Sequence, residues 1–149
     1  MIQALRSLRR HAFETDVTLK TDAVKLLALT SDRRIKNSRD FARIYERRLR
    51  AADGHLLIFA AQNSLGHARF GVSVSKKLGG AVRRTALKRL LREAFRLSQH
   101  ELPSDLDLIL IPQRSTAETA SLADYRQSLV RLTNRLARQV SAPQNEPAR

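Results

Sequence analysis

Hydrophobic side chains recur along this chain at two spacings, and the change between them predicts alternating helices and strands. After Ser38, a suitable N-cap residue, apolar positions follow at three- and four-residue spacing: Phe41, Ile44, Tyr45 and Leu49. This spacing is typical of an amphipathic helix and predicts a first helix over residues 38–49. A second apolar stripe predicts a last helix over residues 121–139: Leu122, Leu129, Leu132 and Leu136.

Three shorter apolar runs, residues 55–61, 68–75 and 107–111, have the length of strands. The first two are separated by Asn63, Ser64 and Gly66, so we expect antiparallel strands joined by a turn. In the second run, Phe70, Val72 and Val74 share one face. The opposite face holds small groups that could floor a groove: Gly71, Ser73 and Ser75.

The length of 149 residues favours one domain, which we place at residues 29–140. We expect residues 1–28 to be a mobile extension without a secretory signal, and the Pro-rich segment 141–149 to be a disordered tail. No apolar run approaches the roughly 18 residues of a membrane-spanning helix. The absence of cysteine excludes disulfides and cysteine-ligated zinc, and it agrees with a cytoplasmic protein.

Positive charge is concentrated in two short segments. The formal net charge is +14, and residues 33–50 carry eight basic and two acidic side chains. Residues 76–97 carry eight basic side chains and one acidic residue, Glu93. Because the rest of the chain is nearly neutral, this clustering favours a nucleic-acid partner over charge spread for solubility.

The second basic segment predicts a helix over residues 84–99, preceded by a loop that contains Gly79 and Gly80. At about 100° per residue, the cations lie within about 140° of Arg84. The opposite arc is apolar: Ala86, Leu87, Leu90, Leu91, Ala94 and Leu97. Neighbouring cations on this helix repel one another, and a helix with only a structural role could relieve that repulsion with interleaved glutamates. The uncompensated charge therefore favours a row of phosphate contacts.

The sequence offers no catalytic or metal-binding constellation. The histidines at positions 11, 55, 67 and 100 are scattered, and we interpret Glu101, Asp105 and Asp107 as turn residues around Pro103 and Ser104. Gly79 and Gly80 lack the spacing of a nucleotide-binding loop. We therefore expect no catalytic residue and no metal site in the protein itself.

The segment from Lys76 to Arg96 (KKLGGAVRRTALKRLLREAFR) resembles the signature of the bacterial ribonuclease P protein component family. The similarity extends over residues 29–140, through Ser38–Tyr45, Phe70–Lys77 and Asp107–Ile111. It implies an α+β fold: a small two-layer sandwich with a mixed sheet of about four strands, about three helices and a left-handed βαβ crossover. General topology rules would not predict that crossover.

The resemblance also implies function. The protein would bind the catalytic RNA, which cleaves precursor tRNA with its own bound Mg²⁺, and it would assist removal of the 5′ leader. The RNA-binding candidates are Lys76, Lys77, Arg83, Arg84, Lys88, Arg89, Arg92 and Arg96. The leader-groove candidates are Phe41, Tyr45, Phe59, Ser73 and Ser75, although periodicity alone makes Phe41 and Tyr45 core anchors and Phe59 a core residue.

One departure concerns the start of the basic helix. The family has Arg-Asn-Arg there, whereas this chain follows Arg84 with Thr85 and Ala86, and Arg83 is a candidate replacement for the missing guanidinium.

Two alternative functions stay open from the sequence. One is a structural ribosomal-RNA-binding protein without a role in cleavage, and the other is a helix-turn-helix DNA-binding protein.

Overall fold

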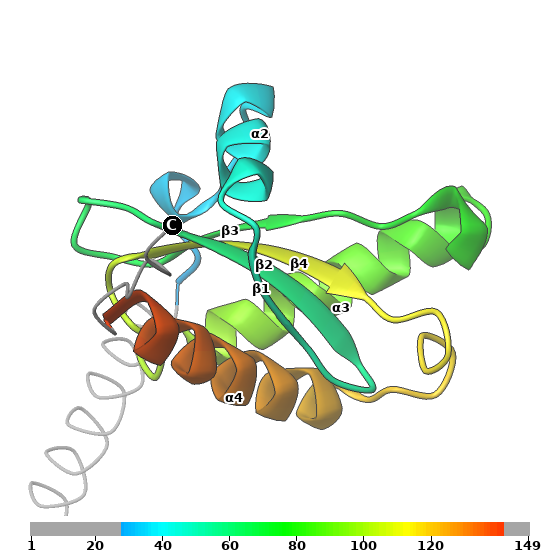
Figure 1. Cartoon of the computed structure of the whole chain (residues 1–149). Coiled ribbons are helices and arrows are strands. Elements are labelled where there is room, and N and C mark those ends of the chain that lie inside the picture. The colour runs from blue at the N-terminus through cyan, green and yellow to red at the C-terminus, as the bar shows by residue number, and fades with distance from the viewer. Residues whose placement is uncertain (1–27, 142–149) are drawn as a thin grey trace, which may run out of the picture.

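The structure, a computed structural model, describes residues 28–141 (Figure 1). The predictions made for segments 1–28 and 141–149 therefore lie outside the described residues, apart from positions 28 and 141. Three α-helices are described: α2 (Ser38–Glu46), α3 (Ala81–Ser98) and α4 (Leu122–Ser141). Two 3₁₀ turns, η1 (Ser31–Arg33) and η2 (Lys76–Leu78), precede α2 and α3.

Four strands form one mixed sheet in the order β1-β2-β4-β3. They are β1 (Leu49–Ala52), β2 (Leu56–Gln62), β3 (Arg69–Val72) and β4 (Leu106–Pro112). β2 pairs antiparallel with β1 and β4, while β3 runs parallel to β4. The two strands before the basic loop run in opposite directions and are joined by a short connection, as expected, but they are not neighbours, because β4 lies between β2 and β3 and pairs with both.

β1 was not anticipated, and it also shortens the first helix, which was expected to reach residue 49. The turn to β2 is built on Asp53, whose Oδ1 accepts hydrogen bonds from the backbone N–H groups of His55 and Leu56 at 2.8 and 2.9 Å. At the start of α2, the N-cap is Asn37 and not Ser38, since the Asn37 side chain accepts from the Arg39 N–H at 2.8 Å.

The main core lies between the sheet and the pair α3 and α4, while α2 crosses the opposite face (Figure 1). Alternate residues of β2 divide between the two layers. Leu56, Ile58 and Ala60 face the main core, whereas Phe59 and Ala61 face α2. Central β4 is buried on both faces along most of its length, as expected for a strand covered by helices on both sides.

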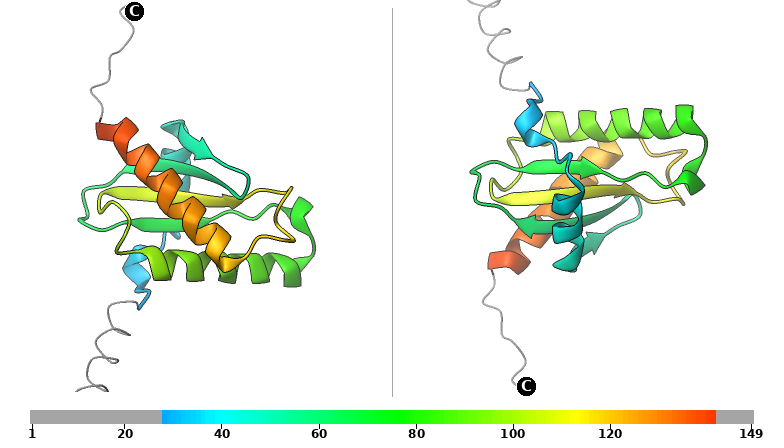
Figure 2. Two further views of the ribbon diagram at one scale, coloured as in Figure 1. Left: turned by 90° about the horizontal axis from the view of Figure 1, so that it is seen from below. Right: turned by 90° about the horizontal axis from the view of Figure 1, so that it is seen from above.

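The connection from β3 through α3 to β4 is a left-handed crossover (Figure 2). The helix returns below the sheet, on the side opposite α2, and lies along the β3 edge. Phe70 of β3 stacks on Phe95 of α3 with ring centroids 4.2 Å apart, which fixes the helix to that edge. The α+β fold with the crossover implied by the sequence resemblance is confirmed.

Candidate nucleic-acid interface

Arg84, Lys88 and Arg92 lie beside the buried face of α3, whereas Arg89 is exposed on the side opposite it. The buried positions are Leu87, Leu91, Ala94, Phe95 and Ser98, so the buried face is rotated toward Arg84 and Lys88 relative to the arc predicted from the sequence. Ala86, expected inside, is exposed. Arg84, Lys88 and Arg92 are half-buried. Part of each side chain is therefore covered by the domain, and at Arg84 the cover extends to Nε, which is buried without a hydrogen-bond partner among the described residues.

Two of the candidate cations are neutralised by carboxylates. Arg83 Nη2 lies 2.7 Å from Glu118 Oε1 in the loop after β4. Arg96 Nε donates to Glu93 Oε2 at 2.9 Å, and this hydrogen bond lowers the pKa of the Glu93 carboxyl. Because Arg83 points toward that loop, it lies on another side of α3 from the Arg84 row. Its role as a replacement guanidinium stays a prediction.

The remaining six candidates have no carboxylate partner among residues 28–141. They are Lys76, Lys77, Arg84, Lys88, Arg89 and Arg92, and we call them the α3 cation face. Thr85 and Ala86, where the sequence departs from the family, are both exposed, so the departure changes surface chemistry and not packing. Six unpaired cations on a rigid support suit a polyanion such as a nucleic-acid backbone.

Gly79 connects the two parts of the α3 cation face. Its φ is +132°, a region that side chains rarely adopt, and an added Cβ would lie 2.7 Å from the Arg83 Cδ. The turn therefore requires glycine, and it brings Lys76 and Lys77 of η2 next to the start of α3. Ser75 supports the turn, because its hydroxyl accepts a hydrogen bond from the Lys77 N–H at 3.2 Å.

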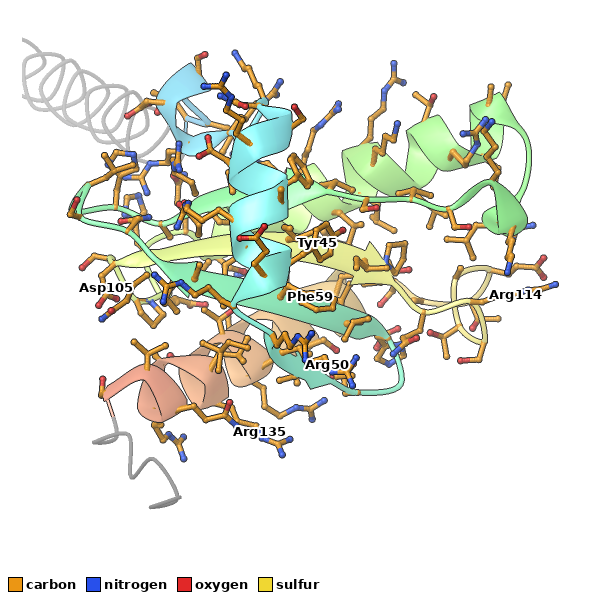
Figure 3. All side chains as sticks on the ribbon, turned by 45° about the horizontal axis from the view of Figure 1, so that its top comes forward. Tyr45, Arg50, Phe59, Asp105, Arg114 and Arg135 are labelled. Atoms are coloured by element: carbon orange, nitrogen blue, oxygen red, sulfur yellow. The ribbon has the colours of Figure 1, made fainter. Side chains whose placement is uncertain are left out.

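The aromatic candidates lie together between α2 and the sheet (Figure 3). Tyr45 meets Phe59 edge to face with centroids 4.9 Å apart, and Tyr45 is 36% exposed. Phe41 lies directly over Gly71, where an added Cβ would be 2.5 Å from the ring. Phe41 and Phe59 are half-buried, so each serves the small α2 core and keeps an exposed edge.

Ser73 and Ser75 follow Gly71 along the chain and continue past the end of β3. Ser73 is half-buried, and its backbone N–H donates to the Leu110 carbonyl at 3.0 Å; Ser75 is exposed. The face of small groups predicted for residues 71–75 is therefore occupied at Gly71 by the Phe41 ring. It is partly accessible beyond that point. We call this surface, formed by Phe41, Tyr45, Phe59, Ser73 and Ser75, the α2 groove.

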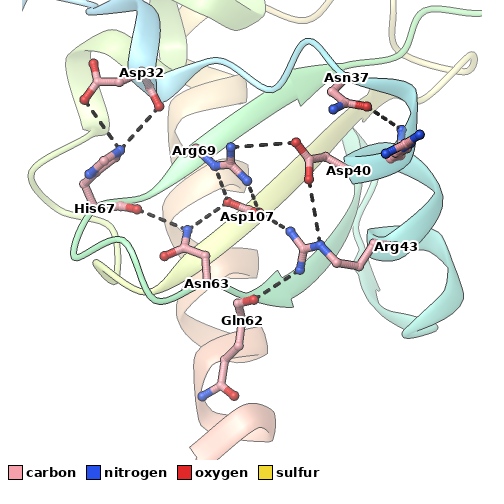
Figure 4. A network of polar contacts seen from close by, with 10 residues as sticks. Asp32, Asn37, Asp40, Arg43, Gln62, Asn63, His67, Arg69 and Asp107 are labelled. Carbon is pink, nitrogen blue, oxygen red and sulfur yellow. Dashed lines mark hydrogen bonds and ion pairs between the residues drawn. The ribbon is translucent and has the colours of Figure 1, made fainter.

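A buried carboxylate holds α2 in place over the sheet (Figure 4). Asp107, whose side chain is fully buried in β4, accepts hydrogen bonds from Arg69 Nε and Asn63 Nδ2, both at 2.8 Å, and from Arg43 of α2. Burial alone would raise the pKa of the Asp107 carboxyl, but the hydrogen bonds from Arg69 and Asn63 lower it. The prediction that Asp107 is a turn residue is wrong.

The described histidines form no catalytic pair. His67 Nε2 lies 3.6 Å from Asp32 Oδ2, and the His55 ring meets Tyr125 at 6.4 Å between centroids. Within residues 28–141 no three His, Cys, Asp or Glu side chains are grouped closely enough to hold a metal ion. Among the helices described, none has the length and apolar character needed to cross a membrane.

A mixed sheet with a left-handed crossover, a face of cations without carboxylate partners in the described residues, and a partly exposed aromatic cluster define a basic α+β domain of the nucleic-acid-binding class. The model of the Ribonuclease P family matches residues 29–137, so the chain belongs to that family. One relative, the ribonuclease P protein component of Pelotomaculum thermopropionicum, is 33% identical over 101 residues, which cover 68% of this chain and 89% of the relative. That of Aliivibrio salmonicida is 37% identical over 106 residues, covering 70% and 89%.

Solved structures agree with this assignment. The ribonuclease P protein from Thermotoga maritima superposes with a TM-score of 0.63 at 28% identity, covering 68% of this chain and 96% of that one. The Staphylococcus aureus protein gives a TM-score of 0.58 at 31% identity, covering 73% and 95%. The sequence resemblance to the bacterial protein components is thereby confirmed.

Proposed function

We propose that this chain, as the protein subunit of ribonuclease P in tRNA processing, binds the catalytic RNA through the α3 cation face. The observation that carries this proposal is the set of six cations on η2 and α3 without a carboxylate partner in the described residues. Each phosphate contact by a cation releases counterions, which favours binding to a folded RNA where phosphates crowd together. Arg83 and Arg96 would join the contact only by exchanging Glu118 and Glu93 for phosphate.

The second part of the proposal places the 5′ leader of precursor tRNA in the α2 groove. Exposed edges of Phe41, Tyr45 and Phe59 can stack on unpaired bases, and aromatic stacking is worth roughly 1–3 kcal/mol per base without requiring a sequence. Ser73 and Ser75 can donate hydrogen bonds to the sugar-phosphate backbone. Because Asp107 and Arg43 hold α2 in position, the groove is largely formed before RNA binds.

In this proposal the RNA subunit hydrolyses the phosphodiester bond, and Mg²⁺ is held in the RNA active site. The protein side contributes charge: its cations offset the repulsion between precursor tRNA and catalytic RNA, which lowers the requirement for free Mg²⁺. A cytoplasmic location follows from this role, since the precursor tRNA substrate is made there in bacteria.

The proposal is tested by cleavage of a precursor tRNA by a bacterial ribonuclease P RNA at low magnesium, with and without this protein. We expect cleavage at the mature 5′ end to be strongly stimulated. A structural ribosomal-RNA-binding protein would bind RNA without stimulating cleavage. A DNA-binding protein would prefer duplex DNA to leader-bearing precursor tRNA in direct competition, and either result would contradict the proposal.

A further inference from the structure

Three arginines at the β1 edge of the sheet form a second group of unpaired cations. Arg47 and Arg48 form the turn after α2, and Arg50 lies in β1. All three are exposed, and none has a carboxylate partner among residues 28–141. Arg47 and Arg48 also line a hollow of about 250 Å³, together with Gln62 of β2 and Gln139 of α4. Guanidinium and amide donors around a hollow suit a phosphate group.

Arg48 adopts a backbone conformation that is unfavourable for its residue type. Its φ is +54°, and it is the only non-glycine residue with positive φ in the described part of the chain. Glycine is the usual residue at such a position after a helix, because a Cβ there meets the backbone. Arginine occupies a backbone position that glycine would adopt with less strain. Strained positions of this kind are often functional, which suggests that the Arg48 side chain takes part in binding.

Arg50 connects this edge to the α2 groove. It is the register partner of Phe59 in the β1/β2 ladder, and partners directly opposite each other in a ladder share a face of the sheet. Arg50 therefore lies on the side of the sheet that carries Phe59 and Tyr45 (Figure 3). β1 is the edge strand farthest from β3, along which α3 lies (Figure 2).

We infer that Arg47, Arg48 and Arg50 bind the backbone phosphates of the distal part of the leader, upstream of the nucleotides in the α2 groove. This inference rests on the proposed function. If the catalytic RNA lies along α3, the cleavage site is near the β3 edge, and a leader crossing the groove leaves the sheet at β1. The three guanidiniums stand at that exit, where they can hold phosphates regardless of base sequence.

The test measures binding of precursor tRNA to the reconstituted ribonucleoprotein, with leaders of about 4 and about 16 nucleotides, the range of site sizes known for single-strand-binding folds. The variant is Arg48→Gly combined with Arg50→Gln. Glycine suits the positive φ at position 48, so the variant folds at least as well as the parent, which thermal unfolding verifies. For single charges, Arg50→Gln is compared with Arg114→Gln, which removes an exposed guanidinium in the loop after β4, away from β1 (Figure 3).

We expect the double variant to bind the long-leader substrate about tenfold more weakly at physiological salt. Its slope of log affinity against log salt should flatten by about 1.4, because each single-strand phosphate that the variant no longer neutralises accounts for about 0.7. The affinity of the double variant for the short-leader substrate should stay within about twofold of the parent's. Arg114→Gln should leave the affinity for both substrates unchanged.

An equal loss of affinity with both leaders would place the contact on the tRNA body or the catalytic RNA and overturn the inference. Unchanged binding of both would also overturn it. If the parent protein itself gains no affinity from the longer leader, the proposed leader-binding function fails as well. The two failures can be told apart. If the parent and the double variant gain the same affinity from the longer leader, only the role of the three arginines is wrong, and the leader-binding function stands.

Discussion

The carboxylate of Asp107 lies fully buried near the start of β4, where a charge is tolerated only if several donors satisfy it. Arg69 and Arg43 provide opposite charge, and Asn63 provides a neutral donor. The two arginines belong to β3 and α2, so one carboxylate joins three elements that are distant in the sequence. The network therefore fixes the position of α2 over the sheet.

Replacing this charge should be costly. We expect Asp107→Asn to lower the free energy of unfolding by about 3 kcal/mol, because it leaves the Arg69 guanidinium partly buried without its counter-charge. Urea denaturation at neutral pH measures the change. Asp105→Asn, an exposed carboxylate two residues earlier, is the matched control and should change stability by less than about 0.5 kcal/mol. Equal effects of the two variants would contradict this account.

Asp53 links the β1/β2 turn to α4, and its environment predicts a pH dependence. Burial alone would raise the pKa of the Asp53 carboxyl, but the nearby Ser128 hydroxyl, the N–H groups of Leu56 and His55, and Arg131 lower it to about 2. A depressed pKa stabilises the fold above the unfolded value of 3.8, and the stabilisation is lost as pH falls through 2.

The difference between these two pKa values corresponds to about 2 kcal/mol at neutral pH. Asp53→Asn should remove that amount at pH 7 and flatten the stability curve between about pH 4 and pH 2, as measured by denaturation across that range. Asp124→Asn is the comparison variant. The Asp124 carboxylate accepts a hydrogen bond from the Ser121 N–H at the start of α4. If the free energy of unfolding of the Asp53 variant falls between about pH 4 and pH 2 as steeply as that of the parent, Asp53 is not the cause of the acid destabilisation.

At the scale of elements, α3 combines a packing role with a binding role, and neither Lys88 nor Arg89 belongs to its fully buried positions. We expect Lys88→Ala with Arg89→Ala to flatten the dependence of log affinity for catalytic RNA on log salt by about 1 to 2. Each phosphate that a cation neutralises accounts for about 0.7 to 0.9 of that slope. Filter binding or fluorescence anisotropy across a salt series measures it.

The control for this prediction removes two exposed guanidiniums away from α3, by Arg114→Ala with Arg135→Ala. The total charge change is the same, so a general field effect would flatten both slopes alike. A slope that stays parental in the α3 variant would show that Lys88 and Arg89 do not touch the RNA backbone.

How well the elements could be predicted depended on whether their evidence was local. The helices and β4 have long or strongly apolar patterns, and they were found within a few residues. β1 was missed because four residues with one large apolar side chain, LRAA, carry almost no periodicity, although the Asp53–Gly54 pair was a usable turn signal. The pairing of β3 with β4 is separated in sequence by all of α3, so no local pattern could reveal it.

The candidate site divides in the same way. The cations of α3 were identified from spacing, but the neutralisation of Arg83 by Glu118 depends on a loop that lies beyond β4 in the sequence. The rotation of the buried face toward Arg84 followed from Phe95, whose stacking on Phe70 a helical projection does not contain. The role of Asp107 was hidden for the same reason, since its partners come from three other parts of the chain.

At the scale of the whole molecule, charge and stability oppose each other. The net charge of +14 includes the six cations of the α3 cation face, and their mutual repulsion destabilises the free protein. The buried Asp107 network is screened far less by salt than these exposed charges are. Added salt should therefore relieve repulsion at the surface while leaving the main internal ion pairs nearly unchanged.

Raising sodium chloride from about 0.1 M to about 1 M shortens the screening length from about 10 Å to about 3 Å. We expect the melting temperature of the isolated protein to rise by a few degrees, since about 1 kcal/mol corresponds to about 2–8 °C for chains of this size range. The Lys88→Ala, Arg89→Ala variant should show a smaller rise, because part of the repulsion is already removed. A melting temperature that falls with salt in both proteins would mean that surface ion pairs, such as Arg131 with Asp53, outweigh the repulsion within the α3 cation face.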